Sequence, residues 1–377
     1  MIYLDNSATT LQKPPEVTAA VTRALSTFGN SGRSFCQPAM LAARSVYEAR
    51  REVASLVELD NPLDIAFTSG ATESLNLVIN SLIRPKDHVI TSVLEHNSVL
   101  RPLYQMGCAL SFIPCDRQGR MKLDGLDALL KSNTRFLVCT HGSNLTGAVT
   151  DVKVLREFCD MHNLIFILDV SQTLGCIETF AKMADVLCFT GHKALLGPQG
   201  TGGIIVNRPL AFGAVKTGGS GSHSFSMSQP QEMPDIFEAG TGNAHGLAGL
   251  KEGTAYINRT SVTVIREHEQ RLRLAFLSGI EPLPGLRLYS APQGADAMVL
   301  PVVALNLEGF TADELAFKLW ENGEIATRSG SHCAPLVHEY FNTRETGMVR
   351  FSFSYFNTPD EIDYTTETLR KIAAKRM

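Results

Sequence analysis

Short apolar runs rich in Val, Ile and Phe recur along the first half of the chain, separated by polar or glycine-containing stretches. Each run has the length of a buried β-strand, and we expect strands over residues 63–68, 88–93, 110–114, 135–140, 164–170 and 186–190. Most runs are separated by segments with the apolar spacing of a helix, for example residues 151–163. This alternation predicts an α/β protein with a largely parallel sheet covered by helices on both faces.

Two helices are expected before the first of these strands. Pro14 and Pro15 open a helix that Gly29 ends, and a second helical pattern covers residues 39–59. Residues 213–234, by contrast, are rich in Gly, Ser, Gln and Met and have little periodicity, which predicts a long loop.

A second α/β block begins near residue 299. Its predicted elements are strands over 299–307 and 349–354, helices over 311–322 and from 359 onwards, and a cysteine-bearing loop between them. We therefore divide the chain into a large domain of residues 13–255 and a small α/β domain formed by residues 1–12 and 256–377.

Composition and charge exclude several classes of partner. Of the 377 residues 44% are hydrophobic and 19% are charged, as in an ordinary globular protein. The formal net charge of -4 and the lack of a local basic patch give no reason to expect nucleic acid or an anionic membrane as a partner. The segment MIYLDNSATT lacks the pattern of a signal peptide, and no window approaches the roughly 18 apolar residues of a membrane span, so we expect a cytoplasmic protein.

The eight cysteines show no C-x-x-C spacing, and several lie inside apolar runs such as FLVCT and VLCFT. We expect most of them to be reduced residues of the core. Cys333 differs because it lies in RSGSHCAP, among Arg, His and Gly, where a partly exposed thiol is a candidate nucleophile. An idle loop thiol and a metal ligand are the alternatives, although no Cys and His at zinc spacing accompany it.

Polar residues collect where the expected strands end, which is where open parallel sheets bind ligands. The run 63–68 leads into SGATESLNL, in which Gly70 and Ala71 allow a tight turn and Thr72 begins a helix. The free amides and positive dipole end of such a helix attract a phosphate group. An ordinary strand–helix turn capped by Thr72 is the alternative.

Three further candidates lie at strand ends. The run 164–170 contains Asp169 near its end, with Gln172 soon after. A carboxylate after the apolar LIFIL is costly to desolvate unless it faces donors or a cation such as a protonated ring nitrogen, and a helix N-cap is the alternative. His96, in LEHNS, and Asn144, in THGSNLTG, lie at two other strand ends. A histidine there stacks on a planar ring, moves protons or completes a hydrogen-bond network.

Lys193 follows the run 186–190 in the glycine-rich segment TGHKALLGPQG. A lysine amine loses its charge readily when it is buried, as a Schiff-base nucleophile requires, whereas a solvated loop lysine is the alternative. Lys193, Asp169 and the turn at Thr72 together predict a flat cofactor with an aldehyde, a basic ring nitrogen and a phosphate. Pyridoxal 5'-phosphate has all three.

Eight short motifs resemble, in their order, those of the class V aminotransferase fold family, and within it the cysteine desulfurases and selenocysteine lyases. They span nearly the whole chain and are YLDNSATT, SGATESLN, LEHNS, SNLTG, LDVSQ, TGHKALLGPQG, EAGTGN and RSGSHCAP. The resemblance implies the type I fold of pyridoxal-phosphate-dependent transferases, with a mainly parallel seven-stranded sheet in the large domain. Ser331 before His332, and DVSQ where DGAQ or DAAQ is frequent, depart from the common pattern and leave substrate preference open.

The resemblance also implies roles for the cofactor residues. Lys193 would carry the cofactor covalently, Asp169 would pair with the pyridine nitrogen, and His96 would stack on the ring and take part in catalysis. The other cofactor residues would be Asn144 and Gln172 near the phenolic oxygen, Ala71, Thr72, Thr190 and His192 around the phosphate, and Thr241 at the phosphate of the partner subunit.

For the substrate, the resemblance implies that Arg350 receives the carboxylate, that Arg328 and Asn144 line the same mouth, and that Cys333 forms a persulfide. We therefore expect a homodimeric cysteine desulfurase with sites at the subunit interface, which converts L-cysteine to L-alanine and transfers the sulfur to Cys333. The short span from Cys333 to Arg350 resembles the second family branch, whose members often need a sulfur- or selenium-acceptor protein and include enzymes that prefer L-selenocysteine.

Three alternatives remain open from the sequence. A selenocysteine lyase would release selenide and leave alanine, and a class V aminotransferase or related lyase would keep Lys193 and Asp169 without needing Cys333. A non-catalytic phosphate-binding or sulfur-assembly module belongs to a different class and would hold no covalently bound cofactor.

Overall fold

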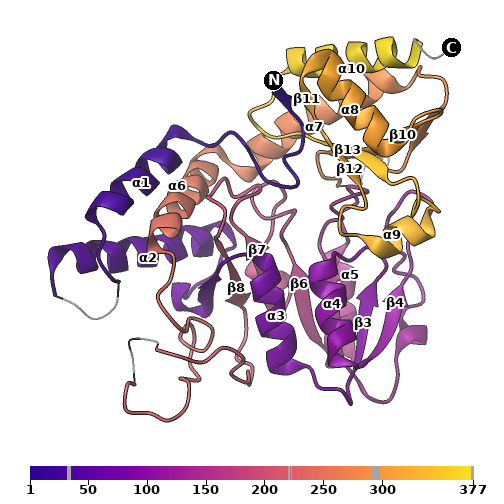
Figure 1. Ribbon diagram of the computed structural model, residues 1–377. Coiled ribbons are helices and arrows are strands. Elements are labelled where there is room, and N and C mark those ends of the chain that lie inside the picture. The colour runs from indigo at the N-terminus through magenta and orange to yellow at the C-terminus, as the bar shows by residue number, and fades with distance from the viewer. Residues whose placement is uncertain (32–34, 220, 222, 291–297, 375–377) are drawn as a thin grey trace.

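A seven-stranded sheet forms the centre of the larger part of the molecule. The computed structural model describes residues 1–31, 35–219, 221, 223–290 and 298–374 (Figure 1). The strand order is β2-β8-β7-β6-β5-β3-β4, and the strands are β2 (Ile65–Thr68), β3 (His88–Ser92), β4 (Ala109–Ile113), β5 (Thr134–Thr140), β6 (Ile165–Asp169), β7 (Val186–Thr190) and β8 (Gly202–Val206). Strand β8 is antiparallel to β2 and β7, and the remaining pairings are parallel.

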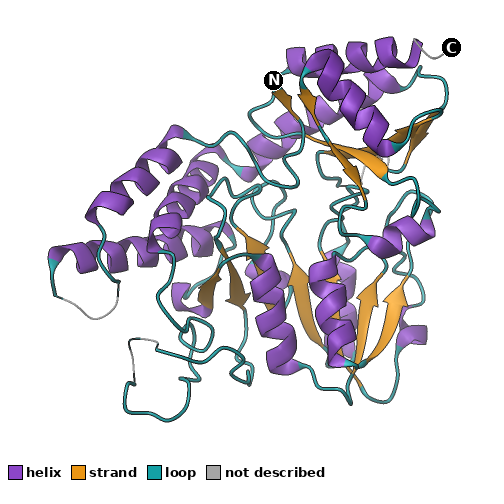
Figure 2. Ribbon diagram, in the orientation of Figure 1, coloured by secondary structure: helices purple, strands orange, loops and turns teal. Residues whose placement is uncertain are grey.

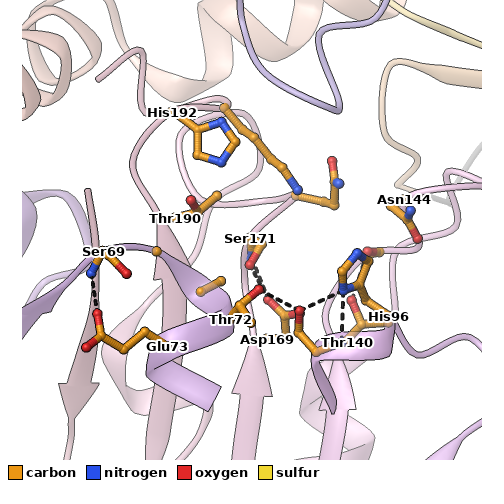
Figure 3. A pocket seen from close by; sticks show the side chains of 16 residues that line it. Ser69, Thr72, Glu73, His96, Thr140, Asn144, Asp169, Ser171, Thr190 and His192 are labelled. Atoms are coloured by element: carbon orange, nitrogen blue, oxygen red, sulfur yellow. Dashed lines mark hydrogen bonds between the residues drawn. The ribbon is translucent and has the colours of Figure 1, made fainter. Parts of the chain in front are cut away.

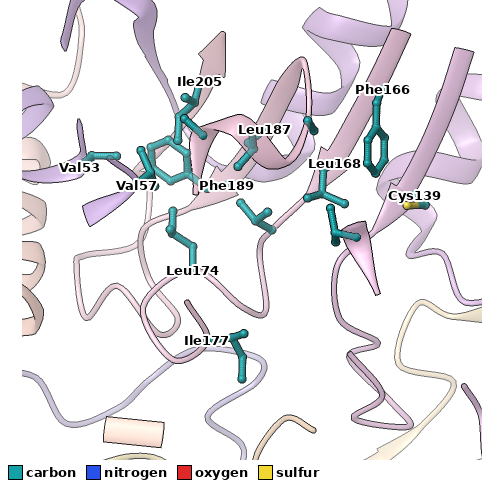
Figure 4. Close-up of a cluster of buried hydrophobic side chains, with 14 of the residues drawn as sticks. Val53, Val57, Cys139, Phe166, Leu168, Leu174, Ile177, Leu187, Phe189 and Ile205 are labelled. Atoms are coloured by element: carbon teal, nitrogen blue, oxygen red, sulfur yellow. The ribbon is translucent and has the colours of Figure 1, made fainter. Parts of the chain in front are cut away.

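Helices cover both faces of this sheet, because successive strand residues point to opposite sides and both sides are apolar. Phe166 and Leu168 of β6 join a cluster with residues of α2 (Gln37–Leu56), α5 (Val152–Met161) and α6 (Ala244–Thr260), part of which Figure 4 shows. Ile167 faces the other way, into a cluster with α3 (Ala71–Leu82) and α4 (Asn97–Met106). Helix α1 (Pro15–Thr27) packs on α6 at the side of the sheet.

A smaller antiparallel sheet lies at the other end of the molecule, with strand order β12-β13-β10-β9 (Figure 2). Its strands are β9 (Leu286–Leu288), β10 (Val302–Leu307), β12 (Arg328–Gly330) and β13 (Met348–Ser352). Apolar residues of α7 (Val262–Ile280), α8 (Ala312–Gly323) and α10 (Pro359–Ala374) form one core with β10 and β13, and the short helix α9 is Pro335–Tyr340.

The start of the chain belongs to this smaller part. Strand β1 (Ile2–Tyr3) pairs in parallel with β11 (Ile325–Ala326), and Leu4 packs in the same core as Phe351. From there the chain crosses to the large sheet, so that residues 5–13 run between the two parts. This path brings Thr10 to the loop that carries Lys193.

The predicted elements agree closely with the fold, including the α/β class and the mainly parallel seven-stranded sheet. The six apolar runs form β2 to β7, and α2 begins at Gln37 and ends at Leu56 rather than covering 39–59. Strand β8, GGIIV, was not among the six runs. Within the described part of residues 213–234 the chain forms neither helix nor strand, as expected. The domain boundaries remain a prediction.

Six of the eight cysteines are buried, in line with the expectation that most belong to the core, and none of the eight, all within the described residues, forms a disulfide. Cys36 is exposed and Cys333 is partly exposed. Within the described residues, no helix combines the length and the apolar character needed to cross a membrane.

Candidate active site

A polar cavity of about 220 Å³ lies beyond the carboxyl ends of the central strands, beside the first turn of α3. Nine of the predicted cofactor residues line it, and they are Ala71, Thr72, His96, Asn144, Asp169, Gln172, Thr190, His192 and Lys193. Figure 3 shows Thr72 of α3, Asp169 at the end of β6 and Thr190 at the end of β7, with His96, Asn144 and His192 around the same cavity. Parallel strands bring their carboxyl ends to one edge of the sheet, so residues far apart in the sequence meet there.

Lys193 lies three residues after β7, on a loop that is hydrogen-bonded to the N-terminal segment. The Thr10 hydroxyl donates to the Lys193 carbonyl at 2.9 Å, and the Thr10 amide donates to the His192 carbonyl at 3.0 Å. Burial lowers the pKa of the Lys193 amine to about 8, although the Asp169 carboxylate acts in the opposite direction. A fraction of this amine is therefore unprotonated near neutral pH and able to act as a nucleophile.

Asp169 is the last residue of β6 and is buried between β5 and β7. One of its oxygens accepts hydrogen bonds from the Ser171 amide at 2.9 Å and from the Ser171 hydroxyl (Figure 3). These donors stabilise the carboxylate and fix its orientation while it still lines the cavity. It is placed to pair with a cation in the cavity.

His96 caps the N-terminus of α4 and lines the cavity. Its Nδ1 accepts the Ser98 amide at 3.0 Å, so the neutral ring carries its proton on Nε2. Burial, with a contribution from the charge of Lys193, lowers the pKa of His96 to about 4. The Ser98 hydroxyl also contacts the Thr72 hydroxyl at 2.8 Å, which links the first turns of α3 and α4.

The other end of the cavity is suited to an anion. Gly70, with φ of 153°, precedes α3, and no side chain caps the helix, so its first amides face the cavity at Ala71 and Thr72. His192 has a buried Nδ1 without a hydrogen-bond partner among the described residues. Burial and the charges of Lys193 and Lys13 lower the pKa of His192 to about 4.

Two of the predicted substrate residues, Arg328 and Arg350, lie outside the cavity lining but influence it electrostatically. Arg328 and Arg350 are register partners on β12 and β13. Both arginine charges lower the pKa of Lys193, whereas Cys333 raises it. Arg328 is exposed, whereas Arg350 is buried and pairs with Asp5 at 2.6 Å. The amide Nδ2 of Asn144 donates to the His332 carbonyl at 2.8 Å, which joins the cavity to the cysteine loop.

Thr241 is the one predicted cofactor residue that does not line this cavity. It lies in an exposed segment just before α6. The sequence assigned it to the phosphate of a partner subunit, so its place on the surface leaves that role a prediction.

Sequence reasoning missed several residues that shape the site, and their signals differ. Ser171 and Ser98 lie two residues after a predicted site residue, a spacing at which a side chain often bonds local backbone. Glu95, directly before His96, is fully buried and accepts the Thr140 amide at 3.0 Å. The role of Asp5 could not be predicted from the sequence, because its partner, Arg350, is distant in the chain.

Lys13 was also missed. Its Nζ donates to the Thr10 carbonyl at 3.0 Å, and burial lowers the pKa of its amine to about 8. Its charge acts on His192 and so adds to the cationic character of this end of the cavity.

Comparison with known proteins identifies the family. Residues 2–365 match Aminotransferase class-V, and the chain belongs to this family. A relative is the cysteine desulfurase of Escherichia coli strain HS, 31% identical over 99% of this chain and 93% of that protein.

Solved structures of cysteine desulfurases are also similar to this chain. The apo structure of a cysteine desulfurase from Thermococcus onnurineus has a TM-score of 0.92, with 29% identity over 99% of this chain and 95% of that chain. The cysteine desulfurase CsdA from Escherichia coli, solved in an S-sulfonic acid form, has a TM-score of 0.88, with 26% identity over 100% of this chain and 95% of that chain.

The family depends on pyridoxal phosphate, and the cavity fits this cofactor by its own chemistry. A lysine amine of lowered pKa can bond to an aldehyde, and an oriented carboxylate is available for the ring nitrogen. At the other end, uncapped helix amides and the unpartnered His192 nitrogen suit a phosphate.

Proposed function

We propose that this protein is a pyridoxal-phosphate-dependent cysteine desulfurase that converts L-cysteine to L-alanine and retains the sulfur as a persulfide on Cys333. The observation that carries the proposal is the attachment of the cysteine loop to the cofactor cavity. The carbonyls of His332 and Cys333 accept hydrogen bonds from Asn144 and Asn97, both next to or within the cavity lining. The reaction of an aminotransferase would not require a thiol at this position.

Lys193 is assigned two tasks in this reaction. It would hold the cofactor covalently in the resting enzyme, and its amine, when free, would take the proton from the substrate Cα. The cofactor, when bound, supplies a ring that withdraws electrons from the substrate. Asp169 would favour the protonated form of the ring nitrogen, and Thr72, Thr190 and His192, which line the cavity, would hold the phosphate.

Cys333 receives the sulfur. Its thiolate attacks the substrate sulfur, an S–S bond forms, and the Cβ–S bond breaks with its electron pair left on Cβ. That carbon then takes up a proton, and return of a proton from the Lys193 amine to Cα completes alanine. The neutral His96 ring lines the cavity, where it would stack on the cofactor and donate a hydrogen bond from its Nε2–H.

The substrate carboxylate is assigned to Arg350 and Arg328. Arg350 keeps one buried donor, Nε, that has no acceptor among the described residues, and Arg328 lies opposite it on the neighbouring strand. A guanidinium presents paired donors to a carboxylate, so the two arginines suit an amino acid substrate.

L-Selenocysteine is the alternative substrate. Selenium leaves carbon more readily than sulfur, and if it departs as elemental selenium the electron pair stays on Cβ, which takes up the selenol proton. This route to alanine needs no external reductant and would not require Cys333. The same residues would otherwise serve, and the two activities differ in their dependence on the thiol.

The assembly is part of the proposal. Two copies are expected to form a homodimer in which Thr241 of each chain reaches the phosphate of the other, and Thr241 is exposed as this requires. We further infer the compact type of cysteine loop, a sulfur-acceptor protein as partner, and a large domain of residues 13–255 with a small domain of 1–12 and 256–377.

The test uses the purified protein with L-cysteine. We expect a yellow protein whose colour borohydride bleaches and that forms alanine in proportion to the sulfur transferred. Lys193→Ala removes the group that borohydride traps and is expected to lose turnover. A colourless protein with no alanine formation would instead indicate a binding module.

A further inference from the structure

Two adjacent residues of the cysteine loop have an unusual backbone conformation. The φ angles of His332 and Cys333 are 50° and 55°. This left-handed region is unfavourable for residues other than glycine, because the Cβ atom approaches the following carbonyl oxygen. Two such residues in succession persist only where their surroundings hold them.

Hydrogen bonds from two different elements hold this pair. The Asn97 amide donates to the Cys333 carbonyl at 2.8 Å, and the Asn144 side-chain amide donates to the His332 carbonyl, also at 2.8 Å. A third bond, from the Ala334 amide to the Ser331 carbonyl at 3.0 Å, closes the turn. Both left-handed residues therefore have their carbonyl oxygens fixed from outside the loop.

The ring of His332 anchors the same loop from another side. Its Nε2 lies 3.2 Å from the Arg328 carbonyl, and it stacks on His338 with ring centroids 6.2 Å apart and an interplanar angle of 6°. His332 is buried, so the residue before the thiol has little freedom to move.

Asn97 is in a special position because it is the first residue of α4. The first amides of a helix have no partner within it, so this N–H is free to bind the Cys333 carbonyl. The residue before it, His96, caps the helix and lines the cofactor cavity. His96 thus places its own ring at the cofactor cavity, and Asn97, the next residue, holds the backbone of the reactive cysteine.

We propose that the backbone amide of Asn97, supported by the side chain of Asn144, is a positioning group that holds the strained Cys333 loop ready for attack on the substrate sulfur. The role in catalysis rests on the proposed desulfurase function. The loop is preorganised, and Asn97 of α4 and Asn144 hold its reactive conformation together with the contacts of His332 to Arg328 and His338.

The substitution Asn97→Pro tests this role by removing a single N–H group. Proline is well tolerated at the first position of a helix, and His96, with φ of -71° and ψ of 153°, has the extended backbone that a following proline requires. Asn97→Ala is the matched control, since it removes the same side chain and keeps the amide. Circular dichroism and cofactor absorbance of both holoenzymes show whether fold and loading are intact.

The first readout is the rate at which iodoacetamide alkylates Cys333, followed by peptide mass spectrometry. The exposed Cys36 in the same chain serves as internal reference. We expect the Cys333 rate, relative to Cys36, to rise about fivefold in Asn97→Pro and to stay at the native value in Asn97→Ala. Release of the Cys333 carbonyl lets the loop relax and exposes the half-buried thiol.

The second readout is alanine formation from L-cysteine. We expect Asn97→Pro to lower kcat about tenfold with KM within twofold of the control, because the arginines that bind substrate are untouched. Equal alkylation and equal kcat in the two variants would overturn the proposal. If the native protein formed no alanine while the alkylation contrast persisted, the desulfurase function would fail and the positioning of the loop would stand.

Asn144→Ala provides an independent test if Asn97→Pro does not fold. Loss of the bond to the His332 carbonyl is also expected to raise the alkylation of Cys333 relative to Cys36. An unchanged ratio in this variant would contradict the proposal, whatever its effect on turnover.

Discussion

Arg350 and Asp5 form a buried ion pair, 2.6 Å between Nη2 and Oδ1, that joins β13 to the start of the chain. Arg350 is 2% exposed and also donates to the Asn144 carbonyl at 3.1 Å. Burial lowers the pKa of this guanidinium, and Asp5 opposes that effect. Asp5 therefore provides the counter-ion of the arginine that we assign to the substrate carboxylate.

The substitution Asp5→Asn leaves the buried Arg350 charge without a counter-ion. We expect the free energy of unfolding to fall by about 2–4 kcal/mol, below the full effect for a buried pair because Asp5 retains some contact with solvent. Urea unfolding monitored by circular dichroism measures this change. Glu157→Gln, which removes an exposed pair with Lys153, is the control and is expected to change stability by less than about 1 kcal/mol. A similar loss in both variants would contradict the special role of Asp5.

Cys333→Ala separates the two candidate substrates. Without the thiol no persulfide forms, so we expect alanine formation from L-cysteine to fall at least about a hundredfold, in line with the loss of a nucleophile. Alanine formation from L-selenocysteine is expected to continue, and both are measured with the same alanine assay. Undiminished turnover of cysteine would show that Cys333 is not the sulfur acceptor.

Glu95 provides a pH-dependent prediction. Its side chain is fully buried, Oε2 has no hydrogen-bond partner among the described residues, and burial raises its pKa from 4.5 to about 8. The folded protein thus keeps a proton that the unfolded chain releases near pH 4.5. Stability is therefore expected to fall as pH rises from about 4.5 to about 8, by up to roughly 1.4 kcal/mol per pH unit from this group.

Glu95→Gln removes this contribution, because glutamine resembles the protonated acid and does not titrate. Urea unfolding of the native protein and the variant at several pH values between 5 and 9 gives the difference. We expect the stability of the variant, relative to the native protein, to increase with pH up to about pH 8 and then to level off. A difference that does not change with pH would mean that Glu95 is ionised in the folded state.

His141 makes the stability depend on pH in the opposite direction, at acidic pH. It is 2% exposed, its Nδ1 contacts the Thr173 hydroxyl at 2.9 Å, and burial lowers its pKa from 6.5 to about 4. The unfolded chain takes up a proton first, so stability is lost as pH falls from about 6.5 to about 4, in total about 3 kcal/mol from this group. His141→Asn keeps a side-chain amide near the hydroxyl of Thr173, and we expect a flatter acid limb in its unfolding curves. An unaltered limb would assign the loss to other groups.

The large sheet was predictable because its signal is local. Each of the six runs is apolar on both faces of its strand, as β6 shows with Phe166 and Leu168 on one side and Ile167 on the other. Strand β8 was missed because Gly202 and Gly203 shorten its apolar pattern, and glycine is depleted in strands. Both are nevertheless required there, since a Cβ at Gly202 would lie 2.5 Å from Gly70.

Much of the cavity lining was predictable for a related reason. Asp169 ends a recognisable strand, Asn144 and Lys193 each follow one, and parallel strands place their carboxyl ends together. Knowing that each residue lies at or just beyond the end of a strand is enough to predict that they meet. Their order in the chain then indicated the family that the comparisons identify.

The sequence by itself determined the α/β fold, the family, the cofactor and the residues that line its cavity, because these depend on local patterns and short motifs. The tertiary structure alone decided what supports them: Asp5 at Arg350, Glu95 behind the cavity and the Asn97 amide at Cys333. An ion pair across the chain needs the folded path of two distant segments, and a backbone amide is the same in nearly every residue. Neither the ion pair nor the amide contact can therefore be predicted from the amino-acid sequence.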